Sequence, residues 1–257
     1  MTKKEHSSRE VLLTSILLIL VALAGITAAT VAWFTIADHA RVQTMGLQLF
    51  TDANLRFDLD SHATFDEYVK TLSFEEIAAR VQQEKGYDMQ QTPLEPVTTG
   101  NYTDFSYEKG QGVSADSGAY IEFTLHFMAT EDMTVYLNPE NSEGGEKDGT
   151  AIESDNEALI DSMRISFTAN DQTWVYDPDM GDVRTQQGQA VLYGLGNTRS
   201  QNSAMFFLQK ETDLPVVVHI WMEGTDPACT NEAGSSDYQI RMRFSGETPE
   251  EQQNKDQ

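Results

Sequence analysis

The feature that most constrains this sequence is a long hydrophobic segment near its start. Val11–Ala37 contains no charged residue. A helix over Val11–Ile36 would be about 39 Å long, enough to cross the roughly 30 Å hydrocarbon core of a membrane with some tilt. The basic residues Lys3, Lys4 and Arg9 precede it, and such flanks stay in the cytoplasm. The segment therefore predicts one N-terminal hydrophobic helix that carries the rest of the chain out of the cytoplasm.

Two fates of this segment stay open, cleavage and retention. Leu12–Leu23 has the composition of the apolar region of a signal peptide, and small residues follow it. Thr30 and Ala32 fit the two small-residue subsites of a signal peptidase, which places the cut between Ala32 and Trp33. The apolar run is also long enough to remain in the membrane. Residues 1–36 are therefore a signal peptide or a membrane anchor, and the protein is expected to be extracytoplasmic, either secreted or anchored.

Charge and cysteine content limit the partners and the chemistry of the chain. The formal net charge is −24, from 41 acidic and 17 basic residues. Such a surface repels nucleic acid and anionic lipid headgroups, so no nucleic-acid partner is expected, whereas cations can be held loosely. Cys229 is the single cysteine, which excludes an intrachain disulfide. The residues after the hydrophobic segment suit one domain with a sizeable core.

Alternating apolar and polar residues predict a mainly β domain. Tyr120–Met128 and Tyr238–Phe244 alternate as half-buried strands do, and Val216–Met222, apolar except for His219, predicts a central strand. Further strands are expected at Thr44–Phe50, Asn54–Leu59, Met133–Leu137, Met163–Thr168, Thr173–Tyr176, Gln189–Tyr193 and Ala204–Gln209. Many short strands separated by turns favour a jelly-roll-like antiparallel β-sandwich over residues 37–246.

Three segments depart from the strand pattern. Thr64–Glu67 and Ser73–Glu76 have the spacing of a capping box, in which the Glu reaches back to the start of the helix. We therefore expect a short helical insertion at about 64–86. Residues 86–118 are polar and rich in Gly, Pro, Thr and Ser, which predicts a long surface loop. The charged, Gln-rich residues 247–257 have little to bury and are expected to be a disordered tail.

Two stretches resemble one group of bacterial proteins. Ala29–Thr35 (ATVAWFT), followed by Met45–Leu49 (MGLQL), is similar to the start of mature TasA/camelysin-type proteins of Gram-positive bacteria, although Ile36 stands where members usually have Asp. Val216–Asn231 (VVVHIWMEGTDPACTN) is similar to a segment near the end of uncharacterised secreted relatives. The resemblance implies a jelly-roll-like sandwich, a SipW-type signal peptide and, for the best-known members, assembly into fibres of the biofilm matrix or the cell surface.

Camelysin was once named a metalloprotease, so the same resemblance makes the histidines candidate zinc ligands. The histidines are His6, His39, His62, His126 and His219. No His-Glu-x-x-His motif occurs among them. His126 and His219 lie on separate predicted strands and can meet on one sheet face, but a solvent-facing strand histidine is the commoner case. No Gly-x-Ser-x-Gly motif occurs either, so no catalytic residue is predicted.

Two sets of acidic residues are candidate calcium ligands. Asp177, Asp179 and Asp182 lie at close spacing around a glycine, as in a calcium loop, but the closing Glu of an EF-hand is absent. Glu223 and Asp226 are a second candidate pair at the end of a predicted strand. Asp, Pro and Gly build β-turns far more often than metal sites, so turns are the main interpretation of both segments. Calcium is the one cofactor considered, and no other is predicted.

The aromatic residues and the cysteine allow two interpretations each. Trp174 and Trp221 lie on predicted strands and are expected to pack in the core or at its edge. A carbohydrate-binding platform would need several exposed aromatic side chains on one face. The candidates for such a platform are Trp174, Tyr193, Phe206 and Phe207. Cys229 has no adjacent basic residue and is expected to be an ordinary thiol.

These observations favour a non-enzymatic protein of the cell surface or extracellular matrix. If cleavage frees Trp33–Phe50, this apolar segment can add as a strand to the sheet edge of a neighbour, which would give self-association or fibres. The expected partners are copies of the chain, other surface proteins and, through the N-terminal helix, the membrane. A glycan- or calcium-binding module is the first alternative. A secreted metalloprotease is the second.

Overall fold

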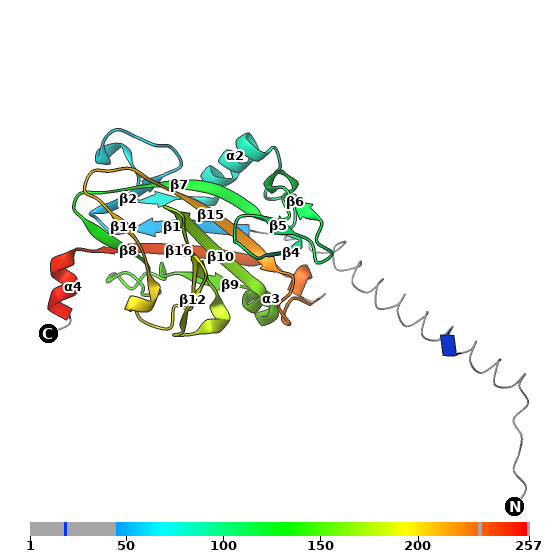
Figure 1. The fold of residues 1–257 in the computed structure, drawn as a ribbon. Helices are drawn as coiled ribbons and strands as arrows, with labels where there is room; N and C mark the ends of the chain where they lie inside the picture. Colours follow the sequence, from blue (N-terminus) through cyan, green and yellow to red (C-terminus); the bar gives the residue numbers. More distant parts are fainter. Residues whose placement is uncertain (1–17, 20–44, 231–232, 256–257) are drawn as a thin grey trace, which may run out of the picture. The chain divides into compact units, whose positions relative to one another are not determined.

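The computed structural model describes residues 18–19, 45–230 and 233–255 (Figure 1). The chain divides into two units, residues 1–39 and 40–257, and the fold below belongs to the second. Most of the predicted hydrophobic helix, and the cleavage position between Ala32 and Trp33, lie outside the described residues. Among the helices that are described, none combines the length and the apolar character needed to cross a membrane.

Two mixed β-sheets form the domain. The first, sheet 1, has the order β14 (Ala204–Leu208), β8 (Met133–Leu137), β16 (Tyr238–Glu247), β1 (Met45–Thr51) and β3 (Thr71–Leu72), with β9 (Ala151–Glu153) also paired to β16. The second, sheet 2, has the order β12 (Arg184–Gln187), β13 (Ala190–Tyr193), β11 (Gln172–Tyr176), β10 (Met163–Ala169), β15 (Leu214–Glu223), β4 (Pro96–Thr99), β5 (Phe105–Ser106) and β6 (Gly112–Val113). In sheet 2, β7 (Ile121–Ala129) pairs with β15, and β2 (Leu55–Asp58) pairs with β7.

The prediction of a mainly β, sandwich-like domain is confirmed, but its strands are not all antiparallel. Each predicted strand is present to within a few residues. However, β1 pairs with β16, β11 with β13 and β4 with β15 in parallel. The physical reason is that alternation along a strand shows which side chains are buried and not in which direction the neighbouring strand runs. The jelly-roll topology stays a prediction.

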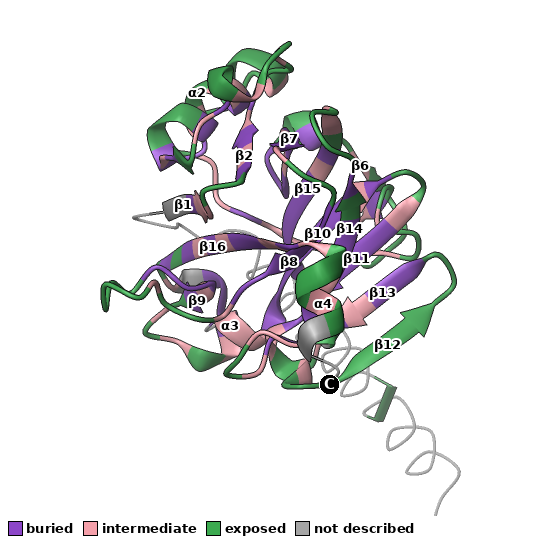
Figure 2. Cartoon of the chain, turned by 90° about the vertical axis from the view of Figure 1, so that its left-hand side faces the viewer, coloured by how far each residue is buried: buried purple, intermediate pink, exposed green. Residues whose placement is uncertain are grey.

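Aromatic side chains from both sheets meet in the core. The ring of Phe244 on β16 makes edge-to-face contacts with the rings of Phe57, Phe127 and Phe167, at centroid distances of 5.9, 5.1 and 5.7 Å. All four residues are fully buried. Edge-to-face geometry is the favourable arrangement for such rings. Figure 2 shows buried residues along β15, β8 and β16, whereas β12 is exposed.

The predicted helical insertion is confirmed. It contains a 3-10 turn, η1 (Phe65–Glu67), and the helix α2 (Phe74–Lys85). Ser73 and Glu76 form the expected capping box, and Gly86 ends the helix with a φ of 85°, which glycine adopts without strain. The helix buries Phe74, Ile77 and Val81 and contacts both β1 and β7, so it covers a margin between the two sheets.

The prediction of a long surface loop over residues 86–118 is wrong. This segment carries β4, β5, β6 and the 3-10 turn η2 (Ala115–Ser117), and it buries apolar side chains. Residues 96–113, which we call the flap, contribute Val97 and Phe105 to a second apolar cluster with Tyr120 and Trp221. The prediction failed because few apolar residues are spread among many turn-forming ones, and their burial depends on a distant strand.

The disordered tail predicted for residues 247–257 is also corrected. Strand β16 extends to Glu247, which is buried, and helix α4 (Pro249–Lys255) follows. Thr248 and Glu251 make the reciprocal hydrogen bonds of a capping box. The side chain of Gln252 donates to the hydroxyl of Tyr136 at 3.0 Å, which ties the helix to sheet 1. The remaining helices are α3 (Glu157–Ser162) and the 3-10 turns η3 (Pro178–Met180), η4 (Gln201–Ser203) and η5 (Ala233–Ser235).

The segment proposed to pair with a neighbour is partly used within the chain itself. Trp33–Phe50 is expected from the sequence to be available after cleavage, but its last residues belong to β1. Strand β1 lies between β16 and β3, with Met45 opposite Tyr238 and Thr51 opposite Phe244 (Figure 1). The edge of β1 next to β16 is therefore occupied along the whole strand, whereas its other edge pairs with β3 at Leu49 and Phe50. Within the described strands, Met45–Gln48 has no neighbour on that second edge. The residues before Met45 lie outside the described residues.

The aromatic core gives a stability prediction. Phe244→Ala removes the ring that contacts three other buried rings, and we expect it to lower the free energy of unfolding by about 3–5 kcal/mol. Urea denaturation followed by tryptophan fluorescence measures this change. Phe207→Ala is the matched control, because Phe207 is 49% exposed and its loss should cost less than about 1 kcal/mol. Equal effects of the two substitutions would contradict the assignment of the core.

Candidate functional site

The outer face of sheet 2 brings polar and aromatic side chains together. His219 and Trp221 of β15 point to this face, opposite Ser166 and Arg164 of β10. Glu122 of β7 lies opposite His219 on the other side. The flap packs over this face through Phe105, whose ring centroid lies 5.2 Å from that of His219 and 5.3 Å from that of Trp221.

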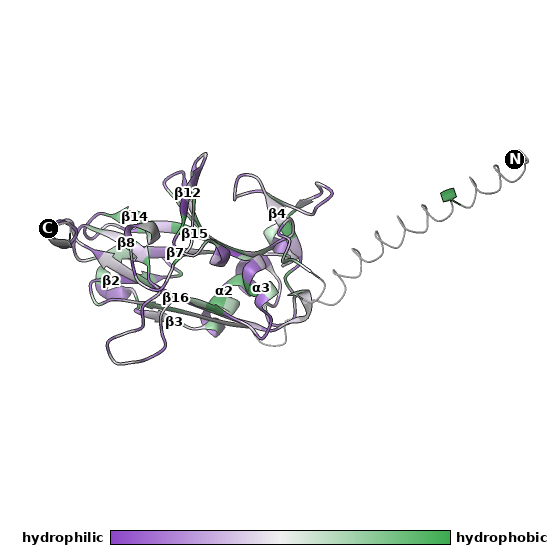
Figure 3. Cartoon of the chain, turned by 90° about the horizontal axis from the view of Figure 1, so that it is seen from below, coloured by the Kyte–Doolittle hydropathy of each residue, from purple (hydrophilic) through white to green (hydrophobic). Residues whose placement is uncertain are grey.

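A polar groove lies beside the flap. It has a volume of about 600 Å³, within the range of small-ligand sites. Its lining residues are Gly100, Asn101, Tyr102, Thr103, Thr168, Asp171, Thr173, Gln187, Gly188, Gln189 and Ala190. One wall is the β4–β5 turn and the other is the β12–β13 turn; Figure 3 shows the β12 and β4 segments projecting on the same side of β15. The groove is thus built from two turns held by one sheet.

The floor of the groove is formed by neighbouring strands of sheet 2. Thr168 of β10 lies opposite Thr173 of β11, and their hydroxyl oxygens are 3.0 Å apart. Ala190 of β13 lies opposite Thr173 on the other side and is buried. The floor therefore offers hydroxyl groups between small side chains.

One wall is held rigid by side-chain hydrogen bonds. Tyr102 has a φ of 61°, the left-handed region that bulky residues rarely adopt. The hydroxyl of Thr99 accepts hydrogen bonds from the backbone N–H groups of Asn101 and Tyr102, at 3.3 and 2.8 Å. The side-chain oxygen of Asn101 accepts from the N–H groups of Thr103 and Asp104, at 3.1 and 2.8 Å. These bonds fix the turn and hold Tyr102 in its unusual backbone conformation.

Tyr102 belongs to the flap and lines the groove. Its centroid is 6.3 Å from that of Trp221, and its hydroxyl donates to the side-chain oxygen of Gln187 at 3.4 Å. Burial, with the nearby carboxylate of Glu223, raises the pKa of Tyr102, so its hydroxyl stays protonated at neutral pH. The two walls thus contact each other through one long hydrogen bond between neutral groups.

The lining of the groove is almost uncharged. Among the described residues that line it, none is Lys, Arg or His, and Asp171 is the one carboxylate. Amides, hydroxyls and backbone groups make up the rest, so the groove offers hydrogen-bond donors and acceptors without a strong field. The groove is therefore suited to hydrogen-bond a neutral polar ligand.

A Ser–His–Glu row lies beneath the flap. The Oγ atom of Ser166 is 3.5 Å from Nδ1 of His219, and Nε2 of His219 is 3.0 Å from a carboxylate oxygen of Glu122. These are the residue types of a hydrolase triad. However, Ser166 is fully buried and His219 is 3% exposed, with the rings of Phe105 and Tyr120 packed against the imidazole. The hydroxyl of Ser166 is sealed from solvent in this conformation, so the row is a buried polar network.

Glu122, at one end of the row, is held by a hydrogen bond and an ion pair. The hydrogen bond from His219 outweighs burial and, together with Lys85 at 2.5 Å, lowers the pKa of Glu122 to about 2. Lys85 is the last residue of α2, so the ion pair joins the helix to sheet 2. Sequence analysis missed this row because the pairing order β7–β15–β10, which makes the three residues neighbours, is not encoded in the strand pattern.

Two of the predicted calcium ligands, Asp177 and Asp226, lie close together, but the positive group between them is the side chain of Arg164. The guanidinium of Arg164 contacts Asp177 at 3.0 Å and Asp226 at 2.5 Å. All three residues are largely buried. Burial raises the pKa of Asp177 although Arg164 opposes this. An added cation would have to compete with the guanidinium for both carboxylates, and calcium at this place stays a prediction.

The other calcium candidates lie in turns. Asp177 caps the 3-10 turn η3 by accepting from the N–H of Asp179 at 3.0 Å, and Asp182 lies against Gly196. Glu223 accepts from the indole N–H of Trp221 at 3.1 Å, and Asp226 accepts from the N–H of Ala228 at 2.8 Å. Both segments thus have the turn geometry expected from their residue types. Within the described part of the chain, no group of three or more His, Cys, Asp or Glu side chains is arranged to hold a metal ion.

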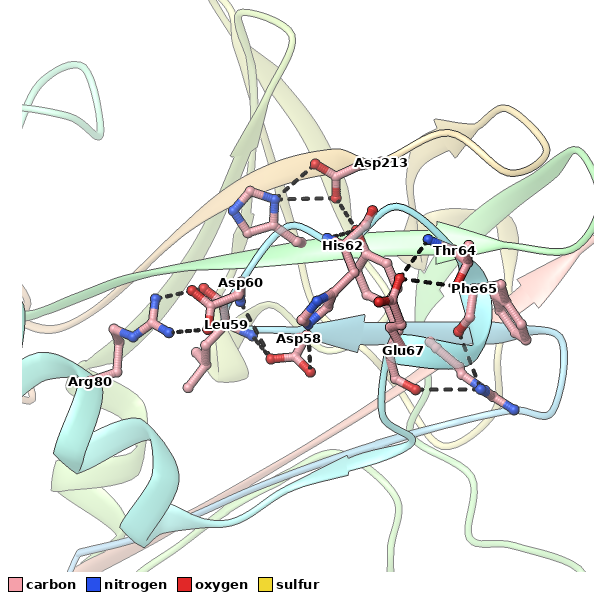
Figure 4. A network of polar contacts seen from close by, with 12 residues as sticks. Asp58, Leu59, Asp60, His62, Thr64, Phe65, Glu67, Arg80 and Asp213 are labelled. Carbon is pink, nitrogen blue, oxygen red and sulfur yellow. Dashed lines mark hydrogen bonds and ion pairs between the residues drawn. The ribbon is translucent and has the colours of Figure 1, made fainter.

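The two strand histidines, His126 and His219, do not meet: across the β7–β15 pair His126 lies opposite Pro215, four residues along β15 from His219. His126 contacts Asp213 at 2.9 Å. His62, in the β2–β3 connection, contacts Asp58 at 3.3 Å (Figure 4). The carboxylate of Asp213 also accepts from the hydroxyls of Tyr68 at 2.7 Å and Ser61 at 2.9 Å. Although burial opposes it, the hydrogen bonds from His126, Tyr68 and Ser61 hold the pKa of Asp213 below its ordinary value. This network fastens the β2–β3 connection to the β14–β15 connection.

The predicted aromatic platform is not formed. Trp174, Tyr193 and Phe206 are buried in the core, and only Phe207 of the four candidates is exposed. The burial of Trp174 and Trp221 agrees with their expected role in packing. Cys229 is also buried, and desolvation with the nearby carboxylates raises its pKa to about 11, so it is not an activated thiol.

The fold and the groove define this protein as a mainly β, two-sheet protein with a neutral polar groove on one face. No family model, no curated protein and no solved structure matches the chain. The resemblance to TasA/camelysin-type proteins therefore stays a prediction from the segments that carry it, Ala29–Thr35 and Val216–Asn231.

The buried row gives a pH prediction. The pKa of Glu122 falls from an ordinary 4.5 to about 2 in the folded protein, so its stabilising contribution is complete above about pH 4.5 and is lost as the pH falls towards 2. Glu122→Gln should lower stability at pH 7 by about 2 kcal/mol, the scale of charge-assisted hydrogen bonds, and less where solvent screens the pair. Thermal unfolding between pH 2 and 7 measures this. If the wild type and variant lost stability in parallel between pH 4.5 and 2, the charge of Glu122 would not stabilise the fold.

Proposed function

We propose that this chain is a non-enzymatic protein of the cell surface or extracellular matrix that acts by reversible binding through the groove beside the flap. The observation that carries the proposal is the almost uncharged, polar lining of this groove. It combines hydroxyl and amide groups with one aromatic side chain and one carboxylate, a composition for recognition. The buried Ser166–His219–Glu122 row supports the non-enzymatic part, because its serine is sealed from solvent.

An extracytoplasmic location is the second part of the proposal. It rests on the charge-free Val11–Ala37 segment and its basic flank. The acidic composition supports it, since a strongly negative surface keeps a protein soluble and apart from anionic lipid headgroups. The TasA/camelysin resemblance agrees with this location. The metalloprotease alternative lacks a ligand set among the described residues.

Treatment of intact host cells with a membrane-impermeant protease tests this proposal. We expect the full-length protein to be degraded while a cytoplasmic marker stays intact, because the domain after residue 40 lies outside. The purified full-length protein should not hydrolyse casein, with or without added zinc. Protection of the domain in intact cells would contradict the location. Casein hydrolysis that a chelator abolishes would replace the binding function by that of a metalloprotease.

Self-association by edge pairing is a second candidate function, favoured by strand β12. This strand pairs with β13 and with no other strand of residues 45–230 and 233–255, and all four of its side chains are exposed. Val183, next to it, is 55% exposed. An uncovered edge offers backbone groups to an extended segment of another chain. The net charge of −24 opposes such contact between copies.

Proline substitution tests the edge. Thr185→Pro and Gln186→Pro each remove one backbone N–H, and adjacent residues of a paired strand direct this group to opposite sides. The substitution that removes an N–H facing away from β13 should abolish association without lowering the melting temperature. The substitution that removes an N–H bonded to β13 should lower the melting temperature, because it breaks a hydrogen bond of the β12–β13 pair. Sedimentation of the full-length protein in detergent measures the effect, and association should increase with salt, which screens the negative charge. A monomer at every salt and calcium concentration would contradict this candidate.

A further inference from the structure

We infer that the ligand of the groove is a neutral carbohydrate chain, with the ring of Tyr102 as the surface on which a sugar ring packs. This inference rests on the proposed function, because it names the ligand class of the same groove. Sugars present an apolar C–H face and a rim of hydroxyl groups. A site for them therefore needs an aromatic side chain beside neutral groups that both donate and accept hydrogen bonds.

The polar groups of the groove match the hydroxyl rim. Gln187 and Gln189 each carry an amide, in which a donor and an acceptor lie side by side, as they do in neighbouring sugar hydroxyls. Thr103, Thr168 and Thr173 add hydroxyls, which can donate or accept according to the ligand. These five side chains come from both walls and from the floor. A chain lying along the groove would contact each of them.

Other ligand classes fit the groove less well. An anionic ligand would meet no cationic side chain among the lining residues and would face an acidic protein. A divalent cation needs several oxygen ligands with negative charge, and Asp171 is the one carboxylate. An apolar ligand would leave the amides and hydroxyls without partners, which is costly. Neutral, hydroxyl-rich ligands avoid all three penalties.

Tyr102 is positioned before any ligand arrives. The Thr99 and Asn101 hydrogen bonds hold its backbone in the left-handed region, a conformation that costs energy for a bulky residue and that is found preferentially at functional sites. A side chain fixed in advance loses little entropy when a ligand binds. The strained turn therefore places an aromatic face at the groove at low cost to binding.

The contact between the two walls is one that a ligand can replace. The hydroxyl of Tyr102 and the amide oxygen of Gln187 are 3.4 Å apart, near the upper limit of a hydrogen bond. When the two walls move apart, a sugar hydroxyl between these oxygens can accept from Tyr102 and donate to Gln187 at ordinary hydrogen-bond distances. The bound chain thus replaces one long hydrogen bond by two better ones.

Calorimetric titration of the full-length protein in detergent micelles tests the inference. The neutral probes are the hexasaccharides of β-1,4-linked glucose and of N-acetylglucosamine, which occur as soluble compounds. The comparison probes are the anionic hexagalacturonate, calcium chloride and an uncharged Gly-Ser hexapeptide. We expect saturable binding of at least one neutral hexasaccharide and none of hexagalacturonate, and calcium should not compete for the groove.

Variants of the groove assign the binding to Tyr102. Tyr102→Asn removes the ring but keeps the turn, because Asn tolerates the left-handed region. It should weaken binding about tenfold or more, whereas Tyr102→Phe, which keeps the ring, should bind within a few-fold of wild type. Thr168→Val removes one floor hydroxyl without changing the size of the side chain and should weaken binding about fivefold. Phe207→Ala is the control, an exposed aromatic outside the groove.

Each outcome decides between the inference and the function on which it rests. Binding of a neutral hexasaccharide that Tyr102→Asn weakens and Phe207→Ala does not would support both. Saturable binding of the hexapeptide alone, abolished by Tyr102→Asn, would overturn the carbohydrate inference but leave the groove as a binding site. Hexasaccharide binding that is unchanged in Tyr102→Asn and Thr168→Val would overturn the inference, because the sugar would lie elsewhere. No saturable binding of any probe would also overturn it, and the surface location would still be decided by protease treatment of cells.

Discussion

The burial of both faces of β15 is the constraint on which this architecture depends. Its inner face, with Val216, Val218 and Ile220, belongs to the core between the sheets, whereas Trp221 on the outer face needs a separate cover. The flap supplies that cover. Its strand β4 pairs with the end of β15 at Met222 and Glu223, and the ring of Phe105 packs on Trp221. Apolar surface left in water would cost about 25 cal/mol per Å², so a segment with few apolar residues still folds over this face.

Covering that face forces its polar residues into closed networks. Glu122, His219 and Ser166 lie in one row across three strands, and Arg164 lies further along β10. A buried charge without a partner is costly, so each carboxylate in these networks is matched by a cation or a hydrogen-bond donor. The same requirement explains why residue types of a hydrolase triad can lie together in a buried polar network. Their geometry satisfies buried groups, and the flap that buries them also excludes a substrate.

The sequence contained the elements of the fold but not their arrangement. Strands such as Met133–Leu137 and the helix at Ser73 were predictable, because alternation and a capping box are local signals. Parallel pairing, the flap and the tail helix were not, because they depend on contacts between distant segments. The site was predictable only in part: Asp177 and Asp226 were recognisable as turn carboxylates, but Arg164 between them was not. Tyr102 carries no signal of a binding role in the sequence, since its backbone conformation becomes visible only in the folded turn.

The groove lies at the margin of the flap, where the outer face of sheet 2 is no longer covered. Beneath the flap, polar side chains are paired with one another, whereas Thr168, Gln187 and Gln189 at its margin remain accessible from solvent. Asp171 is the one carboxylate among the described lining residues, so the groove selects mainly by hydrogen bonding and shape. Binding of a neutral ligand there would depend little on salt, because the ligand carries no charge to be screened. Association of two chains with a charge of −24 each would depend on salt strongly. The two proposed modes of contact therefore respond differently to ionic strength, although both involve β12, whose Gln187 lines the groove.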